Sequence, residues 1–593
     1  MFNMNLWDFL YKYFGEAGKS LLKTYRNIEE GIRKSGLHIY PPVYASLILF
    51  ITLIVSMTFT IAIVVLLLKG YIWLLPFIIP IPFLIFVFMV HLPSLIASNR
   101  AGAIEGEFPY TTAYLSTMVM SGLSPYVAFE RLLRASKILT KSVEIVQRFI
   151  LLTKVLGKDP LTGFIMLADR TPSTSVRDLL TGFVTTVRAG GDVVDYLNKK
   201  ARLMFSEILV KMKIAADRLG GLLESYLAVS LLSLISLLVM YYVSVSFAGV
   251  VAFGLGLGSL FLVIYILLPF ISGLVIYLAD LIQYKESWID YRPYLFFGSF
   301  TIPAIIVTSI FGIVLYNVLP DGNPLKESFI VKGLYIALTT PARLVNAPEY
   351  LYPSTALAVS MIIFTLPAAL YTYYVMREHK LIFGLTRFLR DLVEVRKTGL
   401  SPERAIVELS SRDYGIFSKY LRRIAMQLNL GIPLRRIIED LLDKIMVWRA
   451  KVLLFTMTDT IEVGGGTIET LENLAWFAES VEAIDNEMKR SMRTLLIVPY
   501  MGAILSAVTV IMLTVYMGSV AGLVPGFAAA YTNAALITLP AVIINNYFMG
   551  LVAGKVSGGS VAEGFKHCVI LNLITLVAIA TTAFIKPPTV TPI

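Results

Sequence analysis

Nine long apolar segments constrain the fold of this chain more than any other feature of its sequence. Each is close to the roughly 20 helical residues that cross a bilayer, and none contains Asp, Glu, Lys or Arg. The segments cover residues 43–68, 71–91, 225–248, 253–279, 295–318, 353–376, 494–517, 526–551 and 567–585. With 57% hydrophobic and 15% charged residues, the chain is predicted to be an all-α, polytopic membrane protein.

The positions of the basic residues predict how the chain is oriented. If the N-terminus is cytoplasmic, 46 of the 51 Lys and Arg residues lie in internal segments and five lie outside. This bias follows the positive-inside rule, so we expect an inner (cytoplasmic) membrane protein with its N-terminus inside and its C-terminus outside. The expected parts are an amphipathic cytoplasmic N-terminal helix (1–42), a transmembrane hairpin (43–91), a first cytoplasmic domain (92–224), transmembrane helices three to six (225–376), a second cytoplasmic domain (377–493) and transmembrane helices seven to nine (494–593).

The span at 526–551 is the weakest of the nine. It contains Pro540, Asn545 and Asn546. These residues predict either a kinked helix or a polar contact between helices.

The two cytoplasmic segments repeat the same landmarks in the same order. Gly122-Leu123-Ser124-Pro125 is matched by Gly399-Leu400-Ser401-Pro402, Pro160-Leu161 by Pro433-Leu434, and Gly190-Gly191 by Gly464-Gly465, at offsets of 277, 273 and 274. In each turn, Gly ends one helix, Ser caps the next and Pro takes its first position. We therefore expect two related helix bundles, in which these residues serve folding rather than contact.

The N-terminal 42 residues carry an apolar stripe at helical spacing, with basic residues elsewhere on the same surface. The stripe is formed by Trp7, Tyr11, Phe14, Leu21, Tyr25, Ile28 and Ile32, and the basic residues are Lys12, Lys19, Lys23 and Arg26. This pattern favours a helix that lies at the membrane interface over one that forms a coiled coil.

The sequence offers little material for catalysis or metal binding. Gly15-Glu16-Ala17-Gly18-Lys19-Ser20 fails as a phosphate loop because position 13 is Tyr. The single cysteine, Cys568, and the four histidines form no metal-ligand or nucleophile motif. We expect no catalytic residue, no metal and no cofactor, and hence no enzyme.

The repeated landmarks resemble those of the type II secretion system F-domain family, which comprises platform proteins of type II secretion systems, type IV pili, tight-adherence pili and archaella. The resemblance includes an acidic residue two positions before a Gly-Gly turn. Glu462 fits before Gly464-Gly465, whereas Arg188 stands before Gly190-Gly191. Two copies with about nine spans are most similar to the larger archaeal platform proteins.

The resemblance implies a scaffold whose cytoplasmic domains contact a hexameric secretion ATPase and whose membrane helices gather pilin or archaellin subunits. It further implies a homodimer in the lipid bilayer, and it leaves open an adhesive pilus, a DNA-exchange pilus or an archaellum. Nucleic-acid binding is disfavoured because the two cytoplasmic segments have net charges of only +5 and +2. A polytopic secondary transporter with internal repeats is the alternative, although its usual midplane charges are missing.

Arginines close to the repeated turns are the candidate contacts with the ATPase, and we expect them to be exposed. They are Arg131, Arg134, Arg188, Arg404, Arg422, Arg423, Arg435 and Arg436. For any one of them, the alternative is a solvated surface or contact with lipid headgroups.

Overall fold

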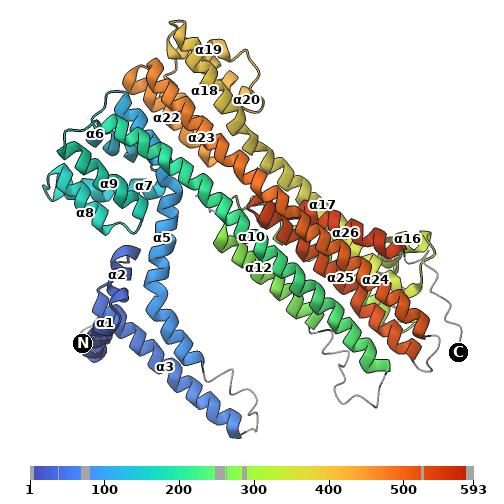
Figure 1. The fold of residues 1–593 in the computed structure, drawn as a ribbon. Coiled ribbons are helices and arrows are strands. Elements are labelled where there is room, and N and C mark those ends of the chain that lie inside the picture. Colours follow the sequence, from blue (N-terminus) through green and yellow to red (C-terminus); the bar gives the residue numbers. More distant parts are fainter. Residues whose placement is uncertain are drawn as a thin grey trace. The chain divides into compact units, whose positions relative to one another are not determined.

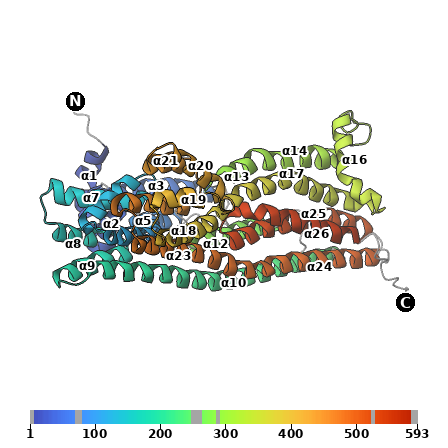
Figure 2. The same ribbon diagram turned by 90° about the horizontal axis from the view of Figure 1, so that it is seen from above.

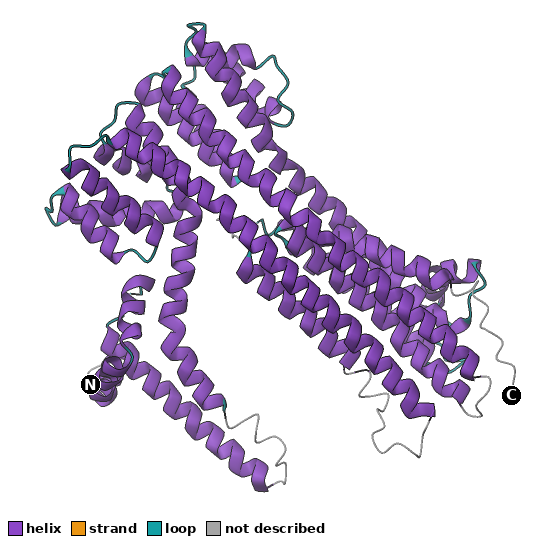
Figure 3. Ribbon diagram, in the orientation of Figure 1, coloured by secondary structure: helices purple, strands orange, loops and turns teal. Residues whose placement is uncertain are grey.

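The computed structural model describes residues 6–37, 39–68, 80–246, 261, 263–283, 290–521 and 527–581. The regular structure in these ranges is helical, with no strand among them (Figure 3). Nine helices in the same ranges are long and apolar enough to cross a membrane. The predicted fold class is therefore confirmed.

The nine membrane helices follow the apolar segments closely. They are α3 (Pro41–Leu68), α5 (Ile81–Met120), α10 (Val193–Ser246), α12 (Leu268–Ile282), the run from α13 to α15 (Arg292–Val318), α17 (Tyr352–Arg377), α24 (Ile497–Ala521), α25 (Phe527–Gly558) and α26 (Gly564–Thr581). Parts of the predicted spans lie outside the described residues, namely 71–79, 247–248, 253–260, 262, 526 and 582–585. Helices α5 and α10 continue well beyond their apolar segments into polar sequence.

The chain forms two compact units. The first comprises Met1–Met204, Leu392–Glu408 and Met426–Phe477, and the second comprises Phe205–Asp391, Leu409–Ala425 and Ala478–Ile593. The first unit thus combines most of one repeated segment with parts of the other.

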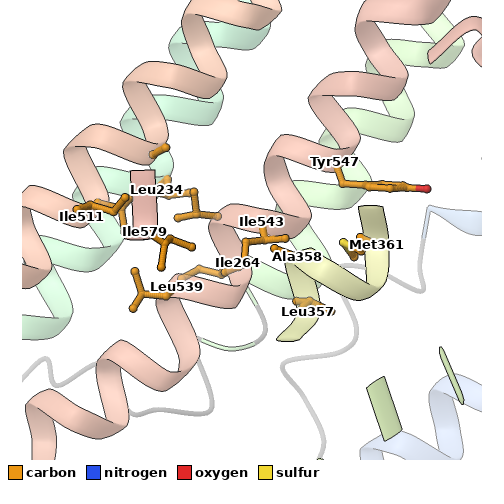
Figure 4. Close-up of a cluster of buried hydrophobic side chains, with 14 of the residues drawn as sticks. Leu234, Ile264, Leu357, Ala358, Met361, Ile511, Leu539, Ile543, Tyr547 and Ile579 are labelled. Carbon is orange, nitrogen blue, oxygen red and sulfur yellow. The ribbon is translucent and has the colours of Figure 1, made fainter. Parts of the chain in front are cut away.

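The second unit is a bundle of membrane helices built around α25. This helix packs against α24, α26, α12 and α17, and α24, α25 and α26 lie side by side in both ribbon views (Figures 1 and 2). Apolar side chains from six helices or helical turns meet in the core shown in Figure 4, among them Leu234, Ile264, Met361, Ile511, Ile543 and Ile579. The apolar window of α25 is 72% buried, compared with 17–50% for the other spans.

This burial explains why residues 526–551 look weak as a membrane span. Helix α25 continues through Pro540. Asn546 accepts a hydrogen bond from the Ser506 hydroxyl (2.8 Å) and donates one to the Thr575 hydroxyl (2.8 Å). The Ser230 hydroxyl donates to Asn545 Oδ1 (3.3 Å). The two asparagines therefore make polar contacts between helices, where lipid does not have to solvate them.

The first unit begins with two short helices, α1 (Leu6–Thr24) and α2 (Arg26–Ser35), where the sequence predicts one. Ile28 and Ile32 are buried in a cluster with Tyr44 of α3 and Val90 of α5. Tyr11 and Tyr25 of the predicted stripe are instead 38% and 40% exposed. Because the helix is interrupted at Tyr25, between α1 and α2, the stripe does not form one continuous buried face. Helix α1 packs mainly against α3, whereas α2 packs mainly against α5 and also contacts α3.

The two repeated segments have the same order of helices. The first contains α6 (Pro125–Arg131), α7 (Thr140–Ile150), α8 (Pro160–Arg170) and α9 (Thr174–Arg188) and leads into α10. The second follows α18 (Leu381–Lys397), contains α19 (Pro402–Leu409), α20 (Phe417–Asn429), α21 (Leu434–Leu442) and α22 (Trp448–Gly464), and leads through α23 (Ile468–Arg493) into α24.

The landmark residues occupy corresponding junctions of the two segments. Gly122 and Gly399 have φ values of +94° and +93°, a region that glycine adopts without strain. Ser124 Oγ and Ser401 Oγ each accept a hydrogen bond from the backbone N–H three residues later, both at 3.4 Å. The Gly190-Gly191 turn lies between α9 and α10, and Gly464-Gly465 joins α22 to α23.

Candidate functional site

A buried carboxylate lies where the two repeated segments meet in the first unit. Asp459 of α22 has no exposed surface. Its Oδ2 accepts a hydrogen bond from the Tyr114 hydroxyl of α5 (2.7 Å). The guanidinium of Arg131, at the end of α6, lies 3.3 Å from Oδ2 and 3.4 Å from Oδ1, and Arg435 of α21 also binds this carboxylate. A buried charge needs such partners because an unpaired one is very costly.

A second carboxylate extends the same network one helical turn later. Asp459 and Glu462 share a face of α22 because they are three residues apart. Glu462 accepts a hydrogen bond from Arg435 Nε (2.5 Å) and pairs with Arg131 Nη2 (3.2 Å) and, more loosely, Arg134 Nη1 (3.8 Å). We call these six residues the ionic cluster: Tyr114, Arg131, Arg134, Arg435, Asp459 and Glu462.

The arginines of the ionic cluster lower the pKa of Glu462 and so favour its charged form. Burial alone would raise the pKa of this carboxyl group, but the hydrogen bond and charge of Arg435, with the charges of Arg131 and Arg134, hold it below its usual value. For Arg435, burial would lower the pKa, yet Glu462 and Asp459 raise it. Arg435 and Glu462 thus stabilise each other's charged forms.

Aromatic side chains pack close to the ionic cluster. Tyr114 stacks on Phe455, with ring centroids 5.7 Å apart, and Tyr110 meets Trp448 edge to face at 4.8 Å. Trp448 Nε1 donates a hydrogen bond to the carbonyl of Ile138 (2.6 Å). These contacts join α5 and the segment after α6 to α22. Aromatic packing and the polar contacts of the ionic cluster therefore hold the first repeated segment against α22 of the second.

The structure brings some of the predicted arginines together and leaves others apart. Arg131 and Arg435 have side chains only 15% and 27% exposed, so the expectation that they are exposed is wrong. Arg131 is partly buried because it pairs with Asp459, which is 328 residues away along the chain. Arg435 is partly buried because it pairs with the same carboxylate, on the helix that follows its own. The exposed members of the predicted set are Arg134, Arg188, Arg404, Arg422, Arg423 and Arg436.

Sequence reasoning found Glu462 but missed Asp459 and Tyr114. A signal for Asp459 was present, since it is the only charged residue in the stretch Val452–Ile461 and precedes Glu462 by three residues. At the offset of 274, the corresponding positions of α9 are Thr185 and Arg188. Both acids of the ionic cluster therefore belong to the second segment, while Arg131 and Arg134 belong to the first.

The arrangement is suited to joining helices. Every carboxylate in the cluster is paired with a guanidinium. The described ranges contain no group of three or more His, Cys, Asp or Glu residues placed to hold a metal ion. The absence of a cofactor and of catalysis stays a prediction.

Comparison with protein families gives two matches within the chain. The family described as Type II secretion system (T2SS), protein F matches residues 111–241 and residues 388–515. No curated protein and no solved structure matches the chain. Each matched range begins in the helix before a Gly-Leu-Ser-Pro turn and ends in a membrane helix, α10 or α24. The first range contains Tyr114 and Arg131, and the second contains Arg435, Asp459 and Glu462.

Proposed function

Since the chain carries two domains of the type II secretion system protein F family, we propose that it is the membrane platform of a machine that assembles a type IV pilus-like filament or an archaellum. This family is linked to the platform proteins of secretion and pilus assembly, which are in general not enzymes. The nine candidate membrane helices agree with a multi-pass platform in the inner membrane.

In this proposal both F domains face the cytoplasm, the N-terminus is cytoplasmic and the C-terminus is outside. A hexameric secretion ATPase docks on the F domains and supplies the energy. Pilin or archaellin subunits approach the membrane helices, and movement of the platform lifts them from the bilayer into the filament. The chain itself contributes the binding surfaces and the covalent connection between them.

The observation that best supports a platform is the ionic cluster. A platform that transmits movement from the ATPase to the filament needs domains that stay in contact with each other. Here the first F domain is fastened to the second by ion pairs that include a fully buried carboxylate, Asp459. Removing one partner of a buried pair costs about 3–5 kcal/mol because the other charge is left buried and unpaired, so each domain depends on the other for its folded contact surface.

The direct test uses the source organism with the gene for this chain deleted. We expect filament subunits to accumulate in the membrane without forming filaments, and expression of the full chain to restore assembly. In vitro, the purified chain in lipid nanodiscs should bind the organism's secretion ATPase. Normal filaments in the deletion strain, together with no binding of the ATPase, would contradict the proposal.

A further inference from the structure

One exposed helix face differs in charge between the two F domains. Helix α20 of the second domain buries Phe417, Leu421 and Ile424. Its opposite side exposes Lys419, Arg422 and Arg423. Met426, one turn further along, is 61% exposed. The face formed by these four exposed residues, the α20 face, is therefore basic and partly apolar.

The corresponding helix of the first domain is α7. A shift of 275, which lies between the landmark offsets of 273 and 277, aligns the buried residues of the two helices. Under this shift Glu144, Gln147 and Arg148 occupy the places of Lys419, Arg422 and Arg423. Leu151 takes the place of Met426 and is 52% exposed. The apolar position is thus common to both domains, while the formal charge is +3 in the second and zero in the first.

Ion pairs neutralise the face of the first domain. Glu144 Oε1 lies 2.5 Å from Arg100 Nη2 and 3.2 Å from Arg148 Nη2. Within the part of the chain that the structure describes, no acidic side chain forms an ion pair with Lys419, Arg422 or Arg423, and the charge of Asp413 acts on Arg422 only from a greater distance. Like charges three and four residues apart on a helix repel each other. An acidic partner would remove this repulsion in α20, and α7 has none to remove.

We propose that the α20 face is a docking surface for an acidic protein partner and that only the second F domain provides it. Arginine and methionine are enriched at protein interfaces, and complementary charge speeds and orients association. This inference rests on the proposed function, in which the partner is the secretion ATPase. Each platform chain then has one docking face of this kind, although it has two F domains.

The position of α20 favours a protein over lipid headgroups. Phe417 of α20 packs against Phe388 of α18 with ring centroids 5.2 Å apart. Phe388 is eleven residues beyond Arg377, the last residue of α17, or about 16 Å along a helix axis. Salt screens charges over about 8 Å at physiological ionic strength. Headgroup charges at the end of α17 therefore act only weakly on α20.

The test compares two triple variants of the full chain in nanodiscs. The docking variant is Lys419→Glu, Arg422→Glu and Arg423→Glu. The control variant is Lys158→Glu, Arg170→Glu and Lys199→Glu. It makes the same change in net charge at three exposed basic residues of the first domain, of which Lys199 pairs with Asp195. Binding of the purified secretion ATPase is measured in phosphatidylcholine nanodiscs at low and high salt, and the melting temperature of each variant checks its folding.

We expect the docking variant to weaken ATPase binding at least about tenfold at low salt and less at high salt, while the control binds like the wild type. Equal loss in both variants, or no loss in the docking variant, would overturn the inference. A loss that appears only when the nanodiscs contain anionic phosphatidylglycerol would assign the face to lipid and overturn it as well. If the wild-type chain itself fails to bind the ATPase, the proposed function fails first, so the two failures are distinguishable.

Discussion

The two F domains of this chain have the same helix order but carry different charges. The second places Asp459 and Glu462 on α22, whereas the first has Thr185 and Arg188 at the corresponding positions of α9. The first supplies Arg131 and Arg134, which meet those acids. Two identical domains that meet about a two-fold axis do so through identical, self-complementary surfaces. In this chain, by contrast, the second domain carries the acids of the contact and the first carries two of the arginines that bind them.

The largest expected effect comes from removing the buried acid of the second domain. Asp459→Ala leaves the Tyr114 hydroxyl without its acceptor and leaves Arg131 and Arg435 with Glu462 as their remaining carboxylate, so we expect a loss of about 3 kcal/mol in stability, the lower end of the range for a broken buried pair. The matched change in the first domain, Thr185→Ala, removes an exposed side chain and should cost less than about 0.5 kcal/mol. Thermal unfolding of the two full-length variants in detergent measures both. Equal losses would mean that the two domains do not differ in the way described.

A smaller loss of stability is expected from removing a neutral hydrogen bond between the two domains, the one that Trp448 donates to Ile138. Trp448→Phe keeps the aromatic packing on Tyr110 but removes the donor to the Ile138 carbonyl, which lies 2.6 Å from Nε1. Leaving this acceptor unpaired should cost about 1–3 kcal/mol. If its effect on the melting temperature equals that of Asp459→Ala, this neutral hydrogen bond contributes as much as the buried carboxylate to holding the two domains together, and charge has no special role there.

Glu462, the half-exposed acid of the ionic cluster, should contribute less to stability than Asp459, and its contribution should depend on pH. The folded-state pKa of Glu462 lies below its ordinary value. Its stabilising contribution is therefore complete above the unfolded-state pKa and is lost as pH falls through the folded-state pKa. Glu462→Gln should remove this part of the acid dependence. Melting temperatures of the variant and the wild type should differ near neutral pH and converge in acid; a constant difference would show that Glu462 acts through packing.

The smallest effect is expected from restoring an acid to the first domain. Arg188→Glu recreates the acidic residue before the Gly190-Gly191 turn. Arg188 is exposed at the end of α9, so the change should alter stability by less than about 0.5 kcal/mol. A stabilisation of more than about 1 kcal/mol would indicate a hidden set of basic partners in the first domain and would erase the asymmetry.

Features fixed by local chemistry could be predicted from the sequence. The apolar segments predicted nine membrane helices, and the Gly-Leu-Ser-Pro and Gly-Gly landmarks fell at corresponding turns. The ionic cluster could not be predicted, because Arg131 and Asp459 are separated by 328 residues and nothing local shows that they meet. For the same reason Arg131 and Arg435 looked like surface residues. The polar span at 526–551 looked weak because sequence alone does not reveal that helices, rather than lipid, surround it.

Formation of a disulfide between the two F domains tests the central claim most directly. A Cβ built on Gly464 would lie 2.9 Å from Ser121 Cβ, so cysteines at these positions need only a small shift to reach the usual separation of about 3.5–4.5 Å. In a Cys568→Ser background, Ser121→Cys with Gly464→Cys should form an intramolecular disulfide under mild oxidation, detected by mass spectrometry of the linked peptides, whereas either single cysteine should not. A folded double variant that stays reduced would contradict the account.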